Sequence, residues 1–203
     1  MLNPGRWQQV MNALHLPPCE GTGRALIAAY AEPQRHYHTA RHLDDCLAKL
    51  DESSHLAEDA GEVELALWFH DAVYNPLKAG NELASAEWAT RFLREAGAEP
   101  GRIERVHALI MATQHSVPAT TDDAKLLVDI DLSILGAYEA GYAEFERNVR
   151  REYRWVPYFL YRKKRREILQ SFLDRARIYN LTPFQERFES RARDNLQQAI
   201  AAL

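Results

Sequence analysis

The stretch Leu67-Trp68-Phe69-His70-Asp71 ends an apolar run whose hydrophobic spacing is that of an α-helix. An imidazole and a carboxylate in such surroundings lose hydration, which is costly unless a partner compensates for it. A divalent cation suits both groups as a partner. The stretch therefore indicates a buried helix that ends at a metal site. The alternative is a buried hydrogen bond between His70 and Asp71.

Helical spacing extends over nearly the whole chain, and no segment shows sustained alternation of apolar and polar residues. We therefore predict an all-α, single-domain multi-helix bundle over residues 1–203. The stretch 126–132 could be a strand by residue type, but a buried helix from about residue 122 fits its neighbours better. The other helices are expected at about 4–14, 21–31, 37–50, 61–74, 81–97, 102–115, 138–153, 157–178 and from 182 onward.

Composition narrows the classes of function. A net charge of −4 argues against nonspecific nucleic-acid binding. No apolar run approaches the roughly 20 residues of a membrane span, so no membrane partner is expected. The first six residues, from Met1 to Arg6, hold no signal-peptide core. Two cysteines, Cys19 and Cys46, make no disulfide framework, which suits a reduced cytoplasmic location.

Several groups that could bind a metal follow one another along the chain. His38 and His42 are spaced to lie on one face of a helix, one turn apart. The pair His70-Asp71 comes next, and Asp129 and Asp131 follow on a later segment. Two or three imidazoles with two carboxylates suit Mn, Fe, Co, Ni or Zn, and Mg is the oxygen-preferring alternative.

The order His, His-Asp, Asp across consecutive helices resembles the HD superfamily of metal-dependent phosphohydrolases. More narrowly, the chain is similar to a bacterial family of predicted HD phosphohydrolases. The resemblance covers most of the chain, and it implies a metal-site core at about 25–135 with the helices of 138–203 packed on it. The stretches that carry it are Tyr-His-Thr-Ala-Arg-His-Leu at 37–43, Trp-Phe-His-Asp-Ala-Val-Tyr at 68–74, Asn-Glu-Leu-Ala-Ser-Ala at 81–86, Thr-Gln-His-Ser at 113–116 and Asp-Ile-Asp-Leu at 129–132.

The resemblance also implies a ligand set of four residues, namely His38, His70, Asp71 and Asp131. Asp129 is the alternative to the last of these. The chain departs from the superfamily at His42, where an apolar residue is more usual. It therefore stays open which histidine of the pair His38 and His42 is the ligand.

The activity that the resemblance implies is hydrolysis of a small phosphorylated molecule, such as a nucleotide or a related phosphoester, by water activated on a divalent metal ion. Asp71 takes part as a ligand. Three further residues could shuttle protons or bind phosphate oxygens, namely Glu82, His42 and His115. Arg165, on the inward stripe of its helix, and Tyr74, at the end of the His-Asp helix, are candidate substrate contacts.

Each of these residues also has a structural interpretation. Glu82 could be a first-turn glutamate favoured by the helix dipole, and His115 a cation at a helix end. The basic run 162–166 could be a solvated face with one inward arginine. Two other functions share the site: a di-iron oxygenase, with His42 and His115 as extra ligands, and a nucleotide-binding regulatory module without catalysis. The sequence does not indicate the oligomeric state.

Overall fold

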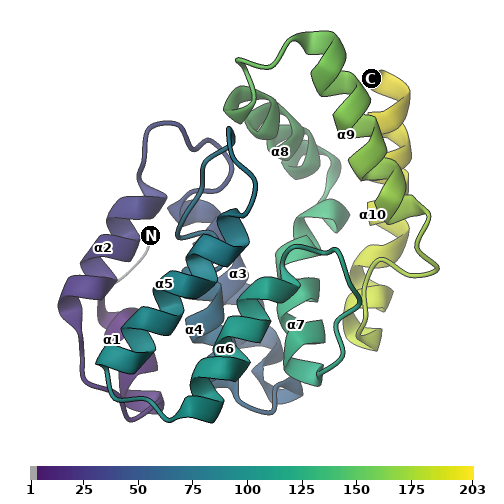
Figure 1. Ribbon diagram of the computed structural model, residues 1–203. Helices are drawn as coiled ribbons and strands as arrows, with labels where there is room; N and C mark the ends of the chain where they lie inside the picture. The colour runs from purple at the N-terminus through teal and green to yellow at the C-terminus, as the bar shows by residue number, and fades with distance from the viewer. Residues whose placement is uncertain (1–3) are drawn as a thin grey trace. The chain divides into compact units, whose positions relative to one another are not determined.

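The computed structural model describes residues 4–203 (Figure 1). Met1 to Asn3, part of the N-terminal stretch in which no signal-peptide core is expected, lie outside the described residues. The described chain contains ten α-helices and two short 3-10 helices, with no strand, so the predicted all-α class is confirmed. Its contacts divide it into two compact units at Ile130 and Asp131. The single-domain and HD-type arrangement remains a prediction.

The first unit holds α1 (Pro4–Ala13), α2 (Glu20–Tyr30), α3 (Ala40–Ser53), η1 (Ser54–Leu56), α4 (Ala60–Phe69), α5 (Asn81–Glu95), α6 (Pro100–Ala112) and nearly all of α7 (Asp122–Asp131). The second holds η2 (Leu132–Gly136), α8 (Glu139–Glu152), α9 (Tyr158–Leu173) and α10 (Thr182–Ala202). Residues 126–131 are helical, as expected for this apolar stretch. None of the helices in the described range is long and apolar enough to cross a membrane.

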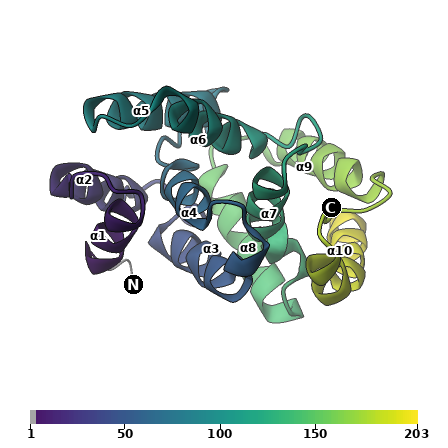
Figure 2. The same cartoon turned by 90° about the horizontal axis from the view of Figure 1, so that it is seen from below.

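Helix α4 is the centre of the first unit. Val63 and every residue of Leu65–Phe69 are fully buried, because the helix is apolar on nearly all sides and its neighbours surround it. Figure 2 shows α5 and α6 together on one side of α4 and α3 on the other, and α1 also contacts it. From Leu65 to Phe69 the helix is therefore enclosed on every side.

Helix α4 ends at Phe69, earlier than the predicted end near Tyr74. The backbone groups that leave the helical pattern find other partners. The guanidinium of Arg35 donates to the carbonyl oxygens of Asp71 (2.6 Å) and Ala72 (3.0 Å). Ser85 of α5 accepts a hydrogen bond from the Val73 amide at 3.0 Å. These contacts hold the chain after α4 in an irregular path, with His70 and Asp71 at its start.

The start of α4 is fixed by charged groups. Asp59 caps the helix by accepting a hydrogen bond from the Glu62 amide at 3.0 Å. The Glu62 carboxylate, almost fully buried, accepts hydrogen bonds from Arg102 (3.0 Å) and Arg105 (2.7 and 2.8 Å) of α6. This ion cluster attaches α6 to the end of α4 opposite His70.

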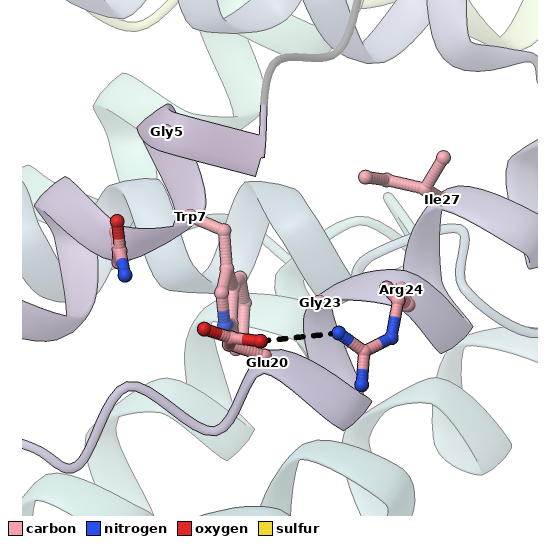
Figure 3. Close-up of a pocket in the computed structure, with 7 residues that line it drawn as sticks. Gly5, Trp7, Glu20, Gly23, Arg24 and Ile27 are labelled. Atoms are coloured by element: carbon pink, nitrogen blue, oxygen red, sulfur yellow. Dashed lines mark hydrogen bonds and ion pairs between the residues drawn. The ribbon is translucent and has the colours of Figure 1, made fainter.

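A pocket lies between α1 and α2 (Figure 3). The Trp7 side chain forms part of its wall and donates from Nε1 to the Pro18 carbonyl at 2.9 Å. At its rim Arg24 pairs with Glu20 at 3.1 Å. The pocket is lined by Gly5, Trp7, Gln8, Glu20, Gly23, Arg24 and Ile27. None of these is a predicted site residue.

Replacing Gly23 with alanine is expected to destabilise the first unit. A Cβ atom at this position would lie 2.7 Å from Cδ1 of Trp7, whose ring is buried and tied to Pro18. Such overpacking costs about 1–3 kcal/mol. Gly21→Ala in the same helix is the matched control, because its Cβ would meet nothing within 4 Å. Urea denaturation compares the two variants, and equal free energies of unfolding would contradict the predicted close packing.

The second unit is assembled around η2. The Asn195 amide of α10 donates to the carbonyl oxygens of Leu135 (2.8 Å) and Ala137 (2.9 Å). The Tyr179 hydroxyl donates to the Leu132 carbonyl at 3.0 Å. These side chains donate to backbone oxygens within and just after the short 3-10 helix and so attach it to the chain before and within α10.

Candidate metal centre

Two consecutive helices bring four candidate ligands together. Helix α3 supplies His42 and Cys46, which are one turn apart and both buried. The end of α4 supplies His70, which is 1% exposed, and Asp71, whose side chain is 18% exposed. The imidazoles thus lie inside the fold, and the carboxylate lies where solvent reaches the cluster.

Three atoms of this cluster form a small triangle. His42 Nε2 lies 3.1 Å from His70 Nε2, and Asp71 Oδ2 lies 3.0 Å from His70 Nε2 and 3.5 Å from His42 Nε2. Metal–ligand bonds of about 2.0–2.2 Å at tetrahedral angles place neighbouring ligand atoms about 3.3–3.6 Å apart. Shifts of a few tenths of an ångström would therefore let one ion bond all three atoms.

The backbone orients the His70 ring for this role. His70 Nδ1 lies 2.7 Å from the Leu67 carbonyl oxygen. A carbonyl oxygen only accepts, so Nδ1 carries a proton and Nε2 is the ring nitrogen that faces the cluster. Metal-binding histidines are commonly held in this way through their second nitrogen.

The charges at the cluster also favour a cation. Burial opposes ionisation of Asp71, but the imidazoles of His70, His38 and His42 outweigh it and hold the carboxyl pKa well below its usual range. Asp71 is therefore an anion at neutral pH, and the two imidazoles beside it complete a donor set of the kind that first-row metals bind.

Cys46 and Asp131 are two further candidate metal ligands at the cluster. Sγ of Cys46 lies 3.8 Å from each ring nitrogen of His42. One ligand atom each from His42, Cys46, His70 and Asp131 lies within 4.8 Å of the others, so these four residues could hold a metal ion. Asp131 is the last residue of α7, whose preceding residues belong to the first unit, and this helix places its carboxylate.

His38 is not one of these four residues, but its charge acts on Asp71. Helix α3 begins at Ala40, so His38 precedes the helix and does not share a helical face with His42. Its ring stacks on Tyr74, with 4.2 Å between centroids, and its centroid is 6.0 Å from that of His42. The structure thus brings His42 into the cluster, and His38 as a ligand stays a prediction.

The remaining predicted residues occupy varied places. Glu82 is half-buried in the first turn of α5, and Asp129 is fully buried on α7. His115 follows α6 with a positive φ of 54°, which is uncommon for a residue with a side chain. Arg165 lies in the second unit, where Glu146 accepts its hydrogen bonds at 2.5 and 3.1 Å. Their functional roles stay predictions.

Sequence reasoning gave no role to two residues that lie at the cluster. Cys46 follows His42 by four residues, and the spacing used for the histidine pair could have revealed it. Arg35 lies between α2 and α3 with a fully buried side chain. No periodic pattern marks it, because it is outside any helix.

Comparisons of the chain with models of protein families, with curated proteins and with solved structures give no significant match. The fold and the cluster by themselves define an all-helical protein with a candidate centre for a metal ion.

Proposed function

We propose that the protein is a metal-dependent phosphohydrolase that acts on a small phosphorylated molecule, such as a nucleotide or a related phosphoester. The observation that carries the proposal is the triangle of His42 Nε2, His70 Nε2 and Asp71 Oδ2, with edges of 3.0–3.5 Å. The resemblance of the His, His-Asp, Asp order to HD phosphohydrolases supports the choice of reaction.

Each residue of the cluster would have its own role in binding the metal ion. A bound divalent ion would supply Lewis acidity and a nucleophilic water at neutral pH. His42 and His70 would hold the ion through their Nε2 atoms, and Asp71 would balance part of its charge. Because Asp71 is partly exposed, the substrate would approach from its side of the cluster.

Other side chains are proposed partners of the substrate. His38 and Tyr74 form a stacked pair beside the cluster and would border the phosphate. Glu82 and His115 remain proposed proton carriers, and Arg165 a proposed contact for an anionic substrate. Cys46 adds a soft donor, which favours Fe, Co, Ni or Zn over Mg.

The test is elemental analysis of the purified protein, followed by removal of metal and reloading with Mn, Fe, Co, Ni, Zn or Mg. Each form is assayed for phosphate release from a panel of nucleotides and phosphoesters. We expect one ion per chain and release that depends on it. Two irons per chain with oxygen consumption and no phosphate release would favour the oxygenase. An inert metal-bound protein that binds a nucleotide tightly would favour the regulatory module.

A further inference from the structure

Arg35 is a buried arginine between the two segments that carry the candidate ligands. Its side chain is fully buried. Nη1 donates to the carbonyl oxygens of His38 (3.2 Å) and Asp71 (2.6 Å), and Nη2 donates to the carbonyl oxygen of Ala72 (3.0 Å). One guanidinium therefore joins the chain that leads into α3 to the chain that leaves α4.

The surroundings of this cation are unusual. A buried charge generally requires a charged partner, and the carboxylate that pairs with Arg35, Glu32 at 3.0 Å, is itself 43% exposed. The other described contacts are backbone oxygens and aromatic faces: the guanidinium carbon lies 5.3 Å from the ring centroid of Tyr30 and 5.5 Å from that of Tyr74. The planar group thus fixes the positions of main-chain atoms on both segments.

The same contacts reach the side chains of the cluster. Tyr74, which lies under the guanidinium, stacks on the His38 ring at 4.2 Å between centroids. The carbonyl of Asp71 belongs to the residue whose carboxylate closes the triangle. A displacement of either segment would therefore move a candidate ligand by a comparable distance.

We propose that Arg35 is a positioning residue of the metal centre, which holds the two ligand-bearing segments at the separation that an ion requires. This inference rests on the proposed metal-dependent function. Lysine cannot reproduce the contacts fully, because its ammonium lacks the planar fork that binds three carbonyl oxygens at once. Methionine keeps the length of the side chain and loses every donor.

The experiment is a titration of metal-depleted protein with Co²⁺, whose visible absorption spectrum reports the geometry of its ligands. We expect Arg35→Met to bind Co²⁺ about 10–100-fold more weakly than the unaltered protein, the range usual for loss of a residue that orients metal ligands. Its spectrum should change in shape. Arg35→Lys should lie between the two in affinity and spectrum.

Arg102→Met is the matched control. Arg102 is also largely buried, at 21% exposure, and it donates to Glu62 (3.0 Å) and to the Leu14 carbonyl (2.8 Å) at the far end of α4. Its loss should lower the free energy of unfolding and leave the Co²⁺ affinity and spectrum unchanged. Circular dichroism at the titration temperature establishes whether each variant is folded. If Arg35→Met is unfolded, the comparison is made with Arg35→Lys instead.

The possible results distinguish the positioning role of Arg35 from the proposed metal-dependent function on which it rests. Failure of the unaltered protein to take up Co²⁺ would overturn both. Normal uptake by the unaltered protein with the same affinity and spectrum in the Arg35 variants would overturn the positioning role alone. An equal loss of affinity in Arg35→Met and Arg102→Met would also overturn it, because a general loss of stability would then explain the effect.

Discussion

Replacing His70 with alanine or Asp71 with asparagine is expected to remove the metal ion and with it the hydrolytic activity. His70→Ala deletes one corner of a triangle whose edges are 3.0, 3.1 and 3.5 Å, and Asp71→Asn removes the negative charge from another. Loss of a residue that only orients a ligand costs about 10–100-fold in metal affinity, so loss of a ligand should cost more than about 100-fold. Elemental analysis and isothermal titration with metal measure the effect.

Asp71→Asn is the sharper of the two variants, because it keeps the volume of the side chain and removes its charge. The helical circular dichroism spectrum should therefore persist. His55→Ala is the control for His70→Ala, since His55 is exposed on η1 and has no predicted role. Stoichiometric metal together with full turnover in either site variant would contradict the assignment of the cluster.

Replacing Glu62 with leucine should produce the largest loss of stability. The Glu62 side chain is 1% exposed and accepts three hydrogen bonds from Arg102 and Arg105. Removing one member of a buried ion cluster costs about 3–5 kcal/mol. Arg105 is 57% exposed and can turn toward water, so we expect the lower end of this range. Urea denaturation at neutral pH measures the change.

The same cluster predicts a dependence on pH. Burial opposes ionisation of Glu62, but the hydrogen bonds and charges of Arg105 and Arg102 prevail and lower its pKa from 4.5. The folded protein therefore binds fewer protons here than the unfolded chain, so this stabilisation is present above pH 4.5 and is lost as the pH falls through the folded pKa. The difference in unfolding free energy between the unaltered protein and Glu62→Gln should become smaller as the pH is lowered from 4.5 through the pKa of Glu62 in the folded protein.

Glu99→Gln is the control for this dependence. Glu99 also pairs with Arg105, at 3.1 Å, but its side chain is 60% exposed. Exposed pairs contribute about 0–1 kcal/mol, so Glu99→Gln should have little effect at any pH. The same pH profile for both variants would show that burial of Glu62 does not set the strength of the cluster.

The all-helical fold could be read from the sequence because it depends on local patterns. Helix α10 begins at Thr182, the start expected from the sequence, with Pro183 in its first turn, although Leu181 is the N-cap and no side chain caps the helix. Residues 126–131 are helical despite their strand-like composition. The end of α4 could not be read in the same way. The path after Phe69 depends on a hydrogen bond that Ser85 accepts from the Val73 amide and on the guanidinium of Arg35, and both residues are far from α4 in sequence.

The sequence allowed us to predict which residue types make up the candidate site, but it did not fully predict which individual residues lie in it. The apolar run before His70-Asp71 indicated a buried polar pair, and the structure places these residues in the cluster. Helix α3 begins at Ala40, so of the two histidines that were expected to share a helical face only His42 lies on the helix, and His38 as a ligand stays a prediction. Sequence spacing fixes such a boundary only to within a few residues.

The most direct test of the central claim is a crystal structure of the protein loaded with Co²⁺ or Zn²⁺, with anomalous diffraction recorded at the absorption edge of the metal. We expect one anomalous peak at bonding distance, about 2.0–2.2 Å, from His42 Nε2, His70 Nε2 and an oxygen of Asp71. An anomalous peak elsewhere, or none at saturating metal, would contradict it.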